Sequence, residues 1–507
     1  MMQNKISILQ IGSDNWSNQL NNRFDWHYTT ISNLPDFLIK QTDPYRLEQD
    51  YVLLTDAHID STLLTEQIRD WPAYRVIYLT QDISTALKDI LTERRAFYFE
   101  DTKPDAIATR IICDLYLGQQ SFNTTFSESQ FIPRYQPTIH FQRQGRFSAQ
   151  FSGDLGEQWQ QLGTLLTFPT DFTPHQDNVT WLEYEATDTA TVALKFLFFD
   201  ANDTLIDTQM ISGADLRTLS TVGGLADYHH YQILVLGMGN GTLDLNVLHQ
   251  YRSRHGLGHL LPGSDWQLTS ENEEILSYFN PGDRQKPLVV YFSDMDRHAI
   301  HFDMVSQLNE LGMPYLIFTD SRLQGGAFHI GSAEYEKTIL AIIKSKMLDL
   351  GLTNKDIILS GCGMGSYPAI YYASDINPAA LIIAKPIVNL GTLSEDKEFP
   401  HQFNQDWTLD LRRYLAGQMS KGDTAAINNK LWHHIIDAPW STIPIALFSM
   451  DQDDYDGKSL PELLHFLTEQ HTPLKHVVQH GGHTEKIPEM LQFMSSMLVL
   501  MRDQLRH

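Results

Sequence analysis

The residue types that support covalent chemistry are concentrated in one glycine-rich turn, residues 360–366 (SGCGMGS). An apolar run precedes this turn and a helix-forming run follows it, which is the strand–turn–helix setting of a G-x-S-x-G nucleophile elbow. In such an elbow the central serine attacks the carbonyl carbon of its substrate. The outer glycines, Gly361 and Gly365, are present, but the serine position is Gly363. The sequence therefore predicts the setting of an acyl-transfer site without its expected nucleophile.

An acid and a base stand where this type of site requires them. In the chain order of α/β-hydrolases, the acid comes after the nucleophile and the histidine comes last. A late apolar run ends in an acidic turn, where Asp453 is the first choice for the acid and Asp454 the second. The final apolar run ends in Gly-Gly-His, where His483 is the expected base and His480 its nearest competitor. The acid would hold the imidazole in the right tautomer and stabilise its protonated form.

Three side chains near Gly363 could replace the missing serine. A thiolate is a competent nucleophile, so Cys362 could act if the turn slips by one residue, although the position before the elbow residue points away from the site. Ser366 lies about one helical turn further along the chain, and Ser360 stands at the end of the strand. In a fourth possibility, the expected base and acid activate water directly.

Backbone N–H groups would stabilise the negative oxygen of an acyl-transfer intermediate. We expect Met364, the residue after the nucleophile position, to supply one donor, and the loop near Ser293 or Asp294 to supply the second. The acidic turn could instead hold a cation, but its spacing does not match an EF-hand loop. We therefore expect no metal ion and no resident cofactor.

The elements that position these residues fall into three predicted domains, and the predicted fold class is α/β. Residues 1–122 alternate apolar runs with helical patterns, which indicates a small α/β (βαβ) domain. Residues 123–268 contain many short strand-like runs, which indicates a β-sandwich with a structural, partner-binding or carbohydrate-binding role. Residues 280–507 indicate an α/β-hydrolase-like doubly wound sheet. Turn residues at 262–264 and 280–283 indicate a linker before this sheet.

The composition argues against several classes of function. The chain has 507 residues, with 37 basic and 62 acidic side chains and a net charge of −25. Binding to duplex nucleic acid, or simple docking to anionic lipid, needs a basic face, so we expect neither. The two cysteines, Cys113 and Cys362, are not a disulfide framework and fit a reducing cytoplasm. The sequence displays neither a signal peptide nor a run of about 20 apolar residues, so we expect a cytoplasmic protein.

Several segments together resemble one known family. They are residues 320–328 (DSRLQGGAF), residues 359–372 (LSGCGMGSYPAIYY), residues 385–392 (KPIVNLGT), the acidic turn that ends at Asp456 and the Gly-Gly-His at His483. On these motifs the chain is similar to the second of the three accessory Sec system proteins. The resemblance is best over residues 285–495 and looser in the first 270 residues, where only the order of the domains supports it.

The resemblance implies a cytoplasmic component of the accessory Sec pathway of Gram-positive bacteria, which exports serine-rich-repeat adhesins that are already O-glycosylated. The implied partners are the two sister accessory Sec proteins, an accessory SecA-type ATPase and the glycosylated adhesin. Family members also resemble O-acetyltransferases that modify N-acetylglucosamine on the adhesin. Carried over to this sequence, the acid is Asp453, the base is His483 and the nucleophile position is Gly363, which departs from the family pattern.

We therefore expect an export component that reaches the membrane, if at all, as a peripheral protein held by its partners. An export component needs binding surfaces and does not need a nucleophile, so Gly363 leaves this role untouched. The alternative is an active O-acetyltransferase or esterase that works on adhesin glycans through a displaced nucleophile, with Cys362 as the first candidate.

Overall fold

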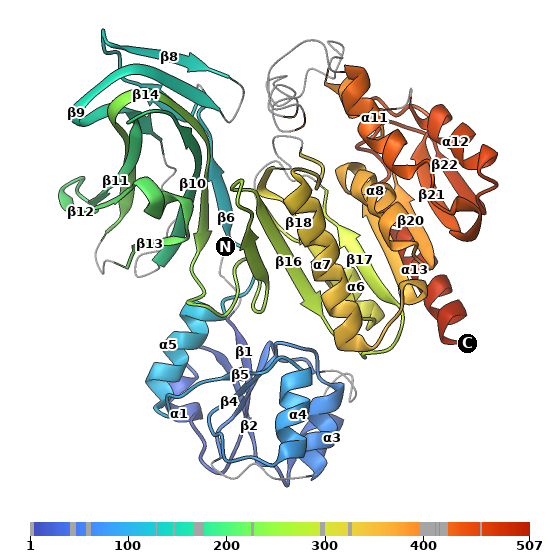
Figure 1. Cartoon of the computed structure of the whole chain (residues 1–507). Coiled ribbons are helices and arrows are strands. Elements are labelled where there is room, and N and C mark those ends of the chain that lie inside the picture. Colours follow the sequence, from blue (N-terminus) through green and yellow to red (C-terminus); the bar gives the residue numbers. More distant parts are fainter. Residues whose placement is uncertain are drawn as a thin grey trace.

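The computed structural model describes residues 5–507 except for 41–46, 57–61, 128, 145–147, 167–176, 225–227, 295–299, 323–326, 395–410, 412–414, 416–423 and 457–458. The described residues form three β-sheets that follow one another along the chain. Figure 1 shows the first sheet in blue below the other two, which lie side by side. Within the described part of the chain, no helix is both long enough and apolar enough to cross a membrane.

The first sheet is parallel and has five strands in the order β2-β1-β3-β4-β5. Its strands are β1 (Ser7–Ile11), β2 (Asp25–Thr29), β3 (Tyr51–Leu54), β4 (Val76–Tyr78) and β5 (Phe97–Tyr98). Its helices are α1 (Ser17–Leu20), α2 (Leu34–Ile39), α3 (Thr62–Asp70), α4 (Thr85–Glu93) and α5 (Pro104–Asp114). This strand order is that of flavodoxin-like doubly wound sheets, and it agrees with the βαβ pattern expected from the sequence.

The second sheet is antiparallel and has nine strands. They are β6 (Ser121–Thr124), β7 (Phe131–Pro133), β8 (Ile139–Arg143), β9 (Ala149–Leu165), β10 (Asp177–Ala186), β11 (Thr191–Phe199), β12 (Leu205–Ser212), β13 (Ser220–Gly223) and β14 (His230–Arg252). The long strands β9 and β14 pair with each other and join all parts of the curved sheet (Figure 1). The first and last strands of this sheet also pair, because Ser121 lies opposite Tyr251.

The third sheet has eight strands in the order β15-β16-β18-β17-β19-β20-β21-β22. They are β15 (Asp265–Leu268), β16 (Glu274–Asn280), β17 (Leu288–Phe292), β18 (Tyr315–Thr319), β19 (Ile357–Cys362), β20 (Ala380–Ala384), β21 (Ile445–Met450) and β22 (Leu474–Gln479). The strands from β18 to β22 in this order are parallel, and β15 and β16 form an antiparallel pair at one edge. The linker expected between residues 264 and 280 is therefore wrong: this segment supplies two strands, and every residue of β16 is buried.

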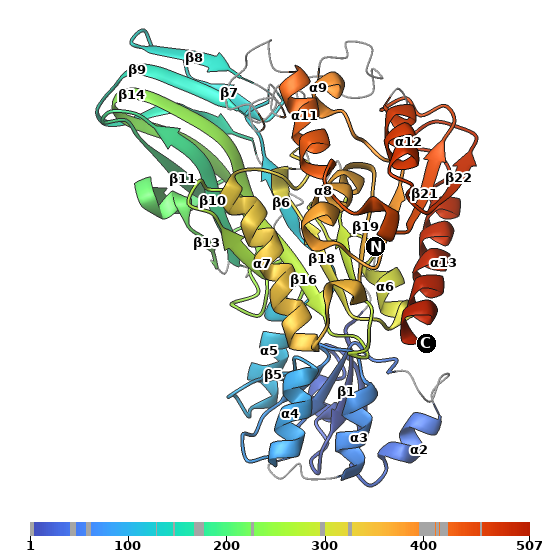
Figure 2. The ribbon, with the colours of Figure 1, turned by 45° about the vertical axis from the view of Figure 1, so that its right-hand side comes forward.

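Helices cover both faces of the third sheet, so its central strands are buried on both sides. These helices are α6 (Val305–Leu311), α7 (Ala333–Leu350), α8 (Ser366–Ile376), α9 (Leu390–Leu393), α11 (Thr424–Ile435), α12 (Leu460–Glu469) and α13 (Ile487–Arg506). Successive residues of β17 alternate between two hydrophobic clusters, one that contains α7, α8, α11 and α12 and one that contains α6 and α13. Figure 2 shows α7 and α13 on opposite faces of the sheet.

The cluster beneath α13 continues into the other two sheets. It contains Leu53 of the first sheet, Trp181 of the second and Leu276 of the third, all of them fully buried. The Trp181 ring stacks on His249 with 4.2 Å between ring centroids, and its Nε1–H donates to Glu274 Oε1 at 3.1 Å. The three sheets therefore share part of one hydrophobic core.

A buried arginine lies where the chain enters the second sheet and where it leaves that sheet again. Arg254 follows β14 and is 1% exposed. Its guanidinium donates to the backbone carbonyls of Asp114, Tyr116 and Gly118 on one side and of His259 and Leu260 on the other. Because five carbonyls accept from one cation, two segments about 140 residues apart are held together.

Candidate functional site

The glycine-rich turn has the geometry of a nucleophile elbow. A short turn, Gly363–Gly365, connects β19 directly to α8. Gly363 has a φ of +51°, in the left-handed region that a strained elbow residue occupies. A Cβ atom at Gly365 would lie 2.0 Å from the Phe292 carbonyl oxygen, so only glycine fits there. The local sequence thus forms the elbow, but Gly363 has no side chain at the position from which the nucleophile would attack.

The expected acid and base lie together at the ends of β21 and β22, which are adjacent parallel strands. His483 Nδ1 is 2.9 Å from Asp453 Oδ2, and the side chains are 10% and 7% exposed. Tyr455 stacks on the imidazole with 4.3 Å between ring centroids. Although burial acts to raise it, the hydrogen bond from His483 and its charge lower the pKa of Asp453 below the ordinary value. An ionised carboxylate thus fixes the imidazole, and the Nε2 atom is left for other contacts.

The two competing residues have different positions. The Asp454 side chain accepts a hydrogen bond from the His483 backbone N–H at 3.0 Å, so it holds the turn and not the imidazole. His480 is at the surface with a side chain 77% exposed, and its Nδ1 lies 3.0 Å from Asp451 Oδ2. The geometry favours Asp453 and His483 over Asp454 and His480.

A buried lysine, which the sequence reasoning did not select as a site residue, supports the histidine turn. Lys385 directly follows β20 and is 2% exposed. Its Nζ donates to the backbone carbonyls of His483 and Glu485. Burial lowers the pKa of Lys385, and the neighbouring Cys362 and Asp453 partly offset this effect. The signal in the sequence is a lone cation at the end of an apolar run, but its target depends on the tertiary fold.

The carboxylate of Asp294 occupies the space in front of the elbow. Its Oδ1 accepts from the Met364 backbone N–H at 2.9 Å, which is the donor expected to bind an oxyanion. A Cβ atom at Gly363 would lie 2.4 Å from Asp294 Oδ2 and 2.7 Å from its Cγ. From the sequence, Asp294 is expected to contribute only its backbone N–H, because the direction of its side chain depends on the fold.

The second oxyanion donor expected near Ser293 or Asp294 is engaged elsewhere in both cases. The Ser293 N–H donates to the Phe318 carbonyl at 3.0 Å, as part of the junction between β17 and β18. The Asp294 N–H donates to Asp303 Oδ2 at 2.7 Å. Of the expected donors, Met364 faces the elbow and already has a carboxylate partner.

The geometry does not favour a displaced nucleophile. Burial, and then the charges of Asp294 and Asp303, hold the pKa of the Cys362 thiol well above its ordinary value, which disfavours the reactive thiolate. The Ser366 hydroxyl donates to the Gly363 carbonyl at 2.6 Å and accepts from a backbone N–H, so it is used within the turn. Ser360 is fully buried inside β19.

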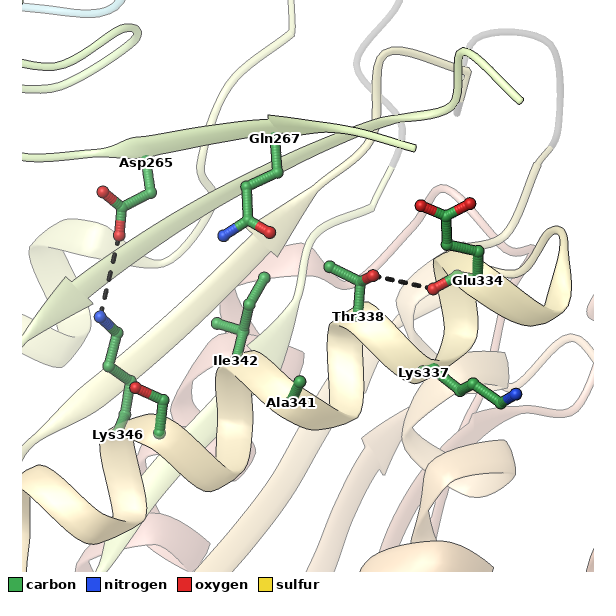
Figure 3. A pocket seen from close by; sticks show the side chains of 9 residues that line it. Asp265, Gln267, Glu334, Lys337, Thr338, Ala341, Ile342 and Lys346 are labelled. Atoms are coloured by element: carbon green, nitrogen blue, oxygen red, sulfur yellow. Dashed lines mark hydrogen bonds and ion pairs between the residues drawn. The ribbon is translucent and has the colours of Figure 1, made fainter. Parts of the chain in front are cut away.

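Among the described residues, no group of three or more His, Cys, Asp or Glu side chains could hold a metal ion. An open groove of about 670 Å³ lies between β15 and α7, at the edge of the sheet away from β22 (Figure 3). Asp265 and Gln267 line one side, and Lys346, which lies 3.8 Å from Asp265, belongs to the other. None of the acid, base or elbow residues lines this groove.

Comparisons with known proteins give a consistent match. A family model described as "Accessory Sec system GspB-transporter" matches residues 6–506. An accessory Sec system protein of Staphylococcus aureus is 30% identical over 351 residues, which are 68% of this chain and 66% of that protein. One of Streptococcus gordonii is 27% identical over 496 residues, which are 96% of this chain and 95% of that protein.

A solved structure matches the whole arrangement. It is the Glycosylation Associate Protein (Gap123) complex from Streptococcus agalactiae, and the matched chain is 26% identical. The superposition has a TM-score of 0.81 and covers 98% of each chain. The likeness therefore extends over all three sheets.

Proposed function

Because this chain belongs to the family of accessory Sec system GspB-transporters, we propose that it is an accessory Sec component that supports the export of glycosylated serine-rich-repeat adhesins. The observation that carries the proposal is the state of the elbow. Gly363 supplies no nucleophile, and the Met364 N–H is occupied by the Asp294 carboxylate. The chain keeps the scaffold of an acyl-transfer site but lacks two of its working parts, which suits binding better than catalysis.

In this proposal the protein works in the cytoplasm with the two sister accessory Sec proteins, an accessory SecA-type ATPase and the glycosylated adhesin, and it reaches the membrane through them. The likeness to a chain of the Gap123 complex supports the sister proteins as partners. The net charge of −25 supports protein or glycan partners over nucleic acid. The nine-stranded second sheet, β6 to β14, then binds a partner or the adhesin glycan.

The test is complementation of a deletion strain of the host bacterium, with surface adhesin measured by immunoblot. We expect deletion to reduce export, and the wild-type gene and a His483→Ala variant to restore it equally, because export needs no proton transfer at His483. Unchanged export after a clean deletion would overturn the proposal. Failure of His483→Ala at normal protein abundance would show that export depends on this site.

One observation favours a second candidate, an O-acetyltransferase or esterase that acts on adhesin glycans. The acid–base pair is intact, with His483 Nδ1 2.9 Å from Asp453 Oδ2. Purified protein would then hydrolyse acetyl esters, and the Cys362→Ala, Ser366→Ala and His483→Ala variants would identify the groups involved. Turnover that is the same in all four proteins would exclude a displaced nucleophile among these residues.

A further inference from the structure

We propose that Asp294 acts together with Gly363 to close this site to acyl transfer, by holding its carboxylate where the reaction's oxyanion would bind. The inference deepens the proposed function and rests on it, because it names the side chain that keeps an acyl-transfer scaffold from reacting. It concerns a residue whose side chain has no role in the ordinary acid, base and nucleophile set.

The Met364 backbone N–H already has a hydrogen-bond partner. In acyl transfer, the N–H after the nucleophile stabilises the negative oxygen of the tetrahedral intermediate. Here that N–H donates to Asp294 Oδ1 at 2.9 Å. The carboxylate both uses the donor and places a negative charge where a second negative charge would develop. Repulsion between the carboxylate and this second negative charge would destabilise the intermediate.

The Asp294 carboxylate fills the space that a side chain at position 363 would need. A side chain at position 363 would begin with a Cβ atom 2.4 Å from Asp294 Oδ2 and 2.7 Å from Cγ. These distances are far shorter than van der Waals contact, so the carboxylate fits only because residue 363 is glycine. Gly363 and Asp294 therefore complement each other, and a serine at 363 would require the carboxylate to move.

Hydrogen bonds of the backbone hold Asp294 in place. Its N–H donates to Asp303 Oδ2 at 2.7 Å, and the Asp303 N–H donates in return to Ser293 Oγ at 3.2 Å. The Ser293 carbonyl accepts from Nε2 of the fully buried His329 at 2.8 Å. These hydrogen bonds fix the backbone of Ser293 and Asp294, which directly follow β17. The fixed backbone directs the Asp294 side chain toward the elbow.

The reaction that a repaired site would perform defines the test. With serine at 363, its Oγ would attack the acetyl carbonyl of p-nitrophenyl acetate while its proton passes to His483 Nε2. The resulting oxyanion would need the Met364 N–H. Collapse would release p-nitrophenolate, and the imidazolium would then lose its proton to solvent. The neutral imidazole would take a proton from water as the water attacks the acetyl-serine, and it would return that proton to the serine oxygen as acetate leaves.

The experiment compares purified full-length wild type, Gly363→Ser, Asp294→Ala and the double variant. We expect no enzymatic turnover in wild type or Asp294→Ala, low turnover in Gly363→Ser and at least about 100-fold more in the double variant, the size of effect that one oxyanion donor has. Adding His483→Ala to the double variant should abolish the gain. The matched control for charge is Asp207→Ala in the Gly363→Ser protein, because Asp207 is exposed on β12, and it should leave turnover unchanged. Gly363→Ser alone as active as the double variant would overturn the proposal.

Thermal unfolding gives a readout that does not depend on activity. We expect Gly363→Ser to lower Tm, and the loss to be smaller when Asp294→Ala is also present, because the added Cβ then meets no carboxylate. The backbone strain of serine at a φ of +51° is the same in both backgrounds and cancels in the comparison. Additive Tm shifts would overturn the predicted contact. Neither readout involves export, so a failed export assay and a failed prediction here are distinguishable.

Discussion

At the scale of single residues, the site is shaped by charges that are buried and have specific partners. The sequence alone predicts His483 and Asp453 as base and acid, because their order along the chain is that of this type of site. It also predicts the missing serine at Gly363, because Gly361 and Gly365 flank that position. Lys385 and the Asp294 side chain could not be predicted, because their roles are contacts across the fold. Asp294 lies 70 residues from Met364 along the chain, and Lys385 lies 98 residues from His483.

We expect Lys385→Met to destabilise the protein by about 1–3 kcal/mol, because the buried carbonyls of His483 and Glu485 lose their donor. Urea unfolding of full-length protein measures this change. The matched control is Lys355→Met, which removes an exposed lysine bonded to Asn377 and should change stability by less than about 0.5 kcal/mol. Equal effects of the two substitutions would contradict the structural role of Lys385.

At the scale of elements, one histidine connects the first sheet's last helix to the second sheet. His255 Nδ1 lies 2.8 Å from Asp114 of α5, and its Nε2 lies 3.0 Å from Asp177 of β10. Partial burial acts to lower its pKa, but the hydrogen bonds with Asp177 and Asp114 raise the pKa of His255 above the ordinary value overall. Both ring nitrogens can donate only when the imidazole is doubly protonated. The hydrogen bonds of His255 with Asp114 and Asp177 are therefore strongest when the ring carries its charge.

The raised pKa of His255 makes the stability of the protein depend on pH. A histidine with a raised folded-state pKa contributes stability that is complete below its unfolded value of about 6.5 and is lost as pH rises through the folded value. We therefore expect His255→Asn to destabilise the protein more at pH 6 than at pH 8.5, measured by urea unfolding at both pH values. An effect of the same size at both would contradict this linkage.

His259 provides a control of opposite sign. Burial, and then Arg254, lower the pKa of His259 to about 4. The wild-type protein therefore loses stability from this group as pH falls through about 6.5, where the unfolded chain takes up the proton. Any cost of His259→Asn should shrink at pH 6, whereas the cost of His255→Asn should grow.

The apolar pattern of the sequence marks most helices and strands of the third sheet, including α7 and β20. The same pattern divides β14 into two apolar runs, 231–236 and 243–247. The glycines between these runs resemble a turn, but in the fold they accompany shifts of register against β9, and the strand bends and continues. A bulge of this kind depends on the partner strand, so local composition cannot identify it.

At the scale of the whole molecule, the shared hydrophobic core should make unfolding cooperative. Trp181 is fully buried where the three sheets meet. We expect Trp181→Ala to cost about 3–5 kcal/mol and to lower a single calorimetric transition as a unit. Leu205→Ala, which truncates a side chain 50% exposed on β12, should leave the transition nearly unchanged. Separate transitions for the three sheets would contradict the shared core.

The pairing of Ser121 with Tyr251 has a consequence for how such proteins can diversify. The chain departs into the second sheet and comes back at one point, and Arg254 fastens the two segments there. The segment from Ser121 to Tyr251 is therefore a continuous insertion with adjacent ends. Recombination could exchange this insertion between relatives while the residues at its two ends stay the same. An exchanged insertion would bring its own outer surface. It would need to keep the contacts with the rest of the chain, such as that between Trp181 and Glu274.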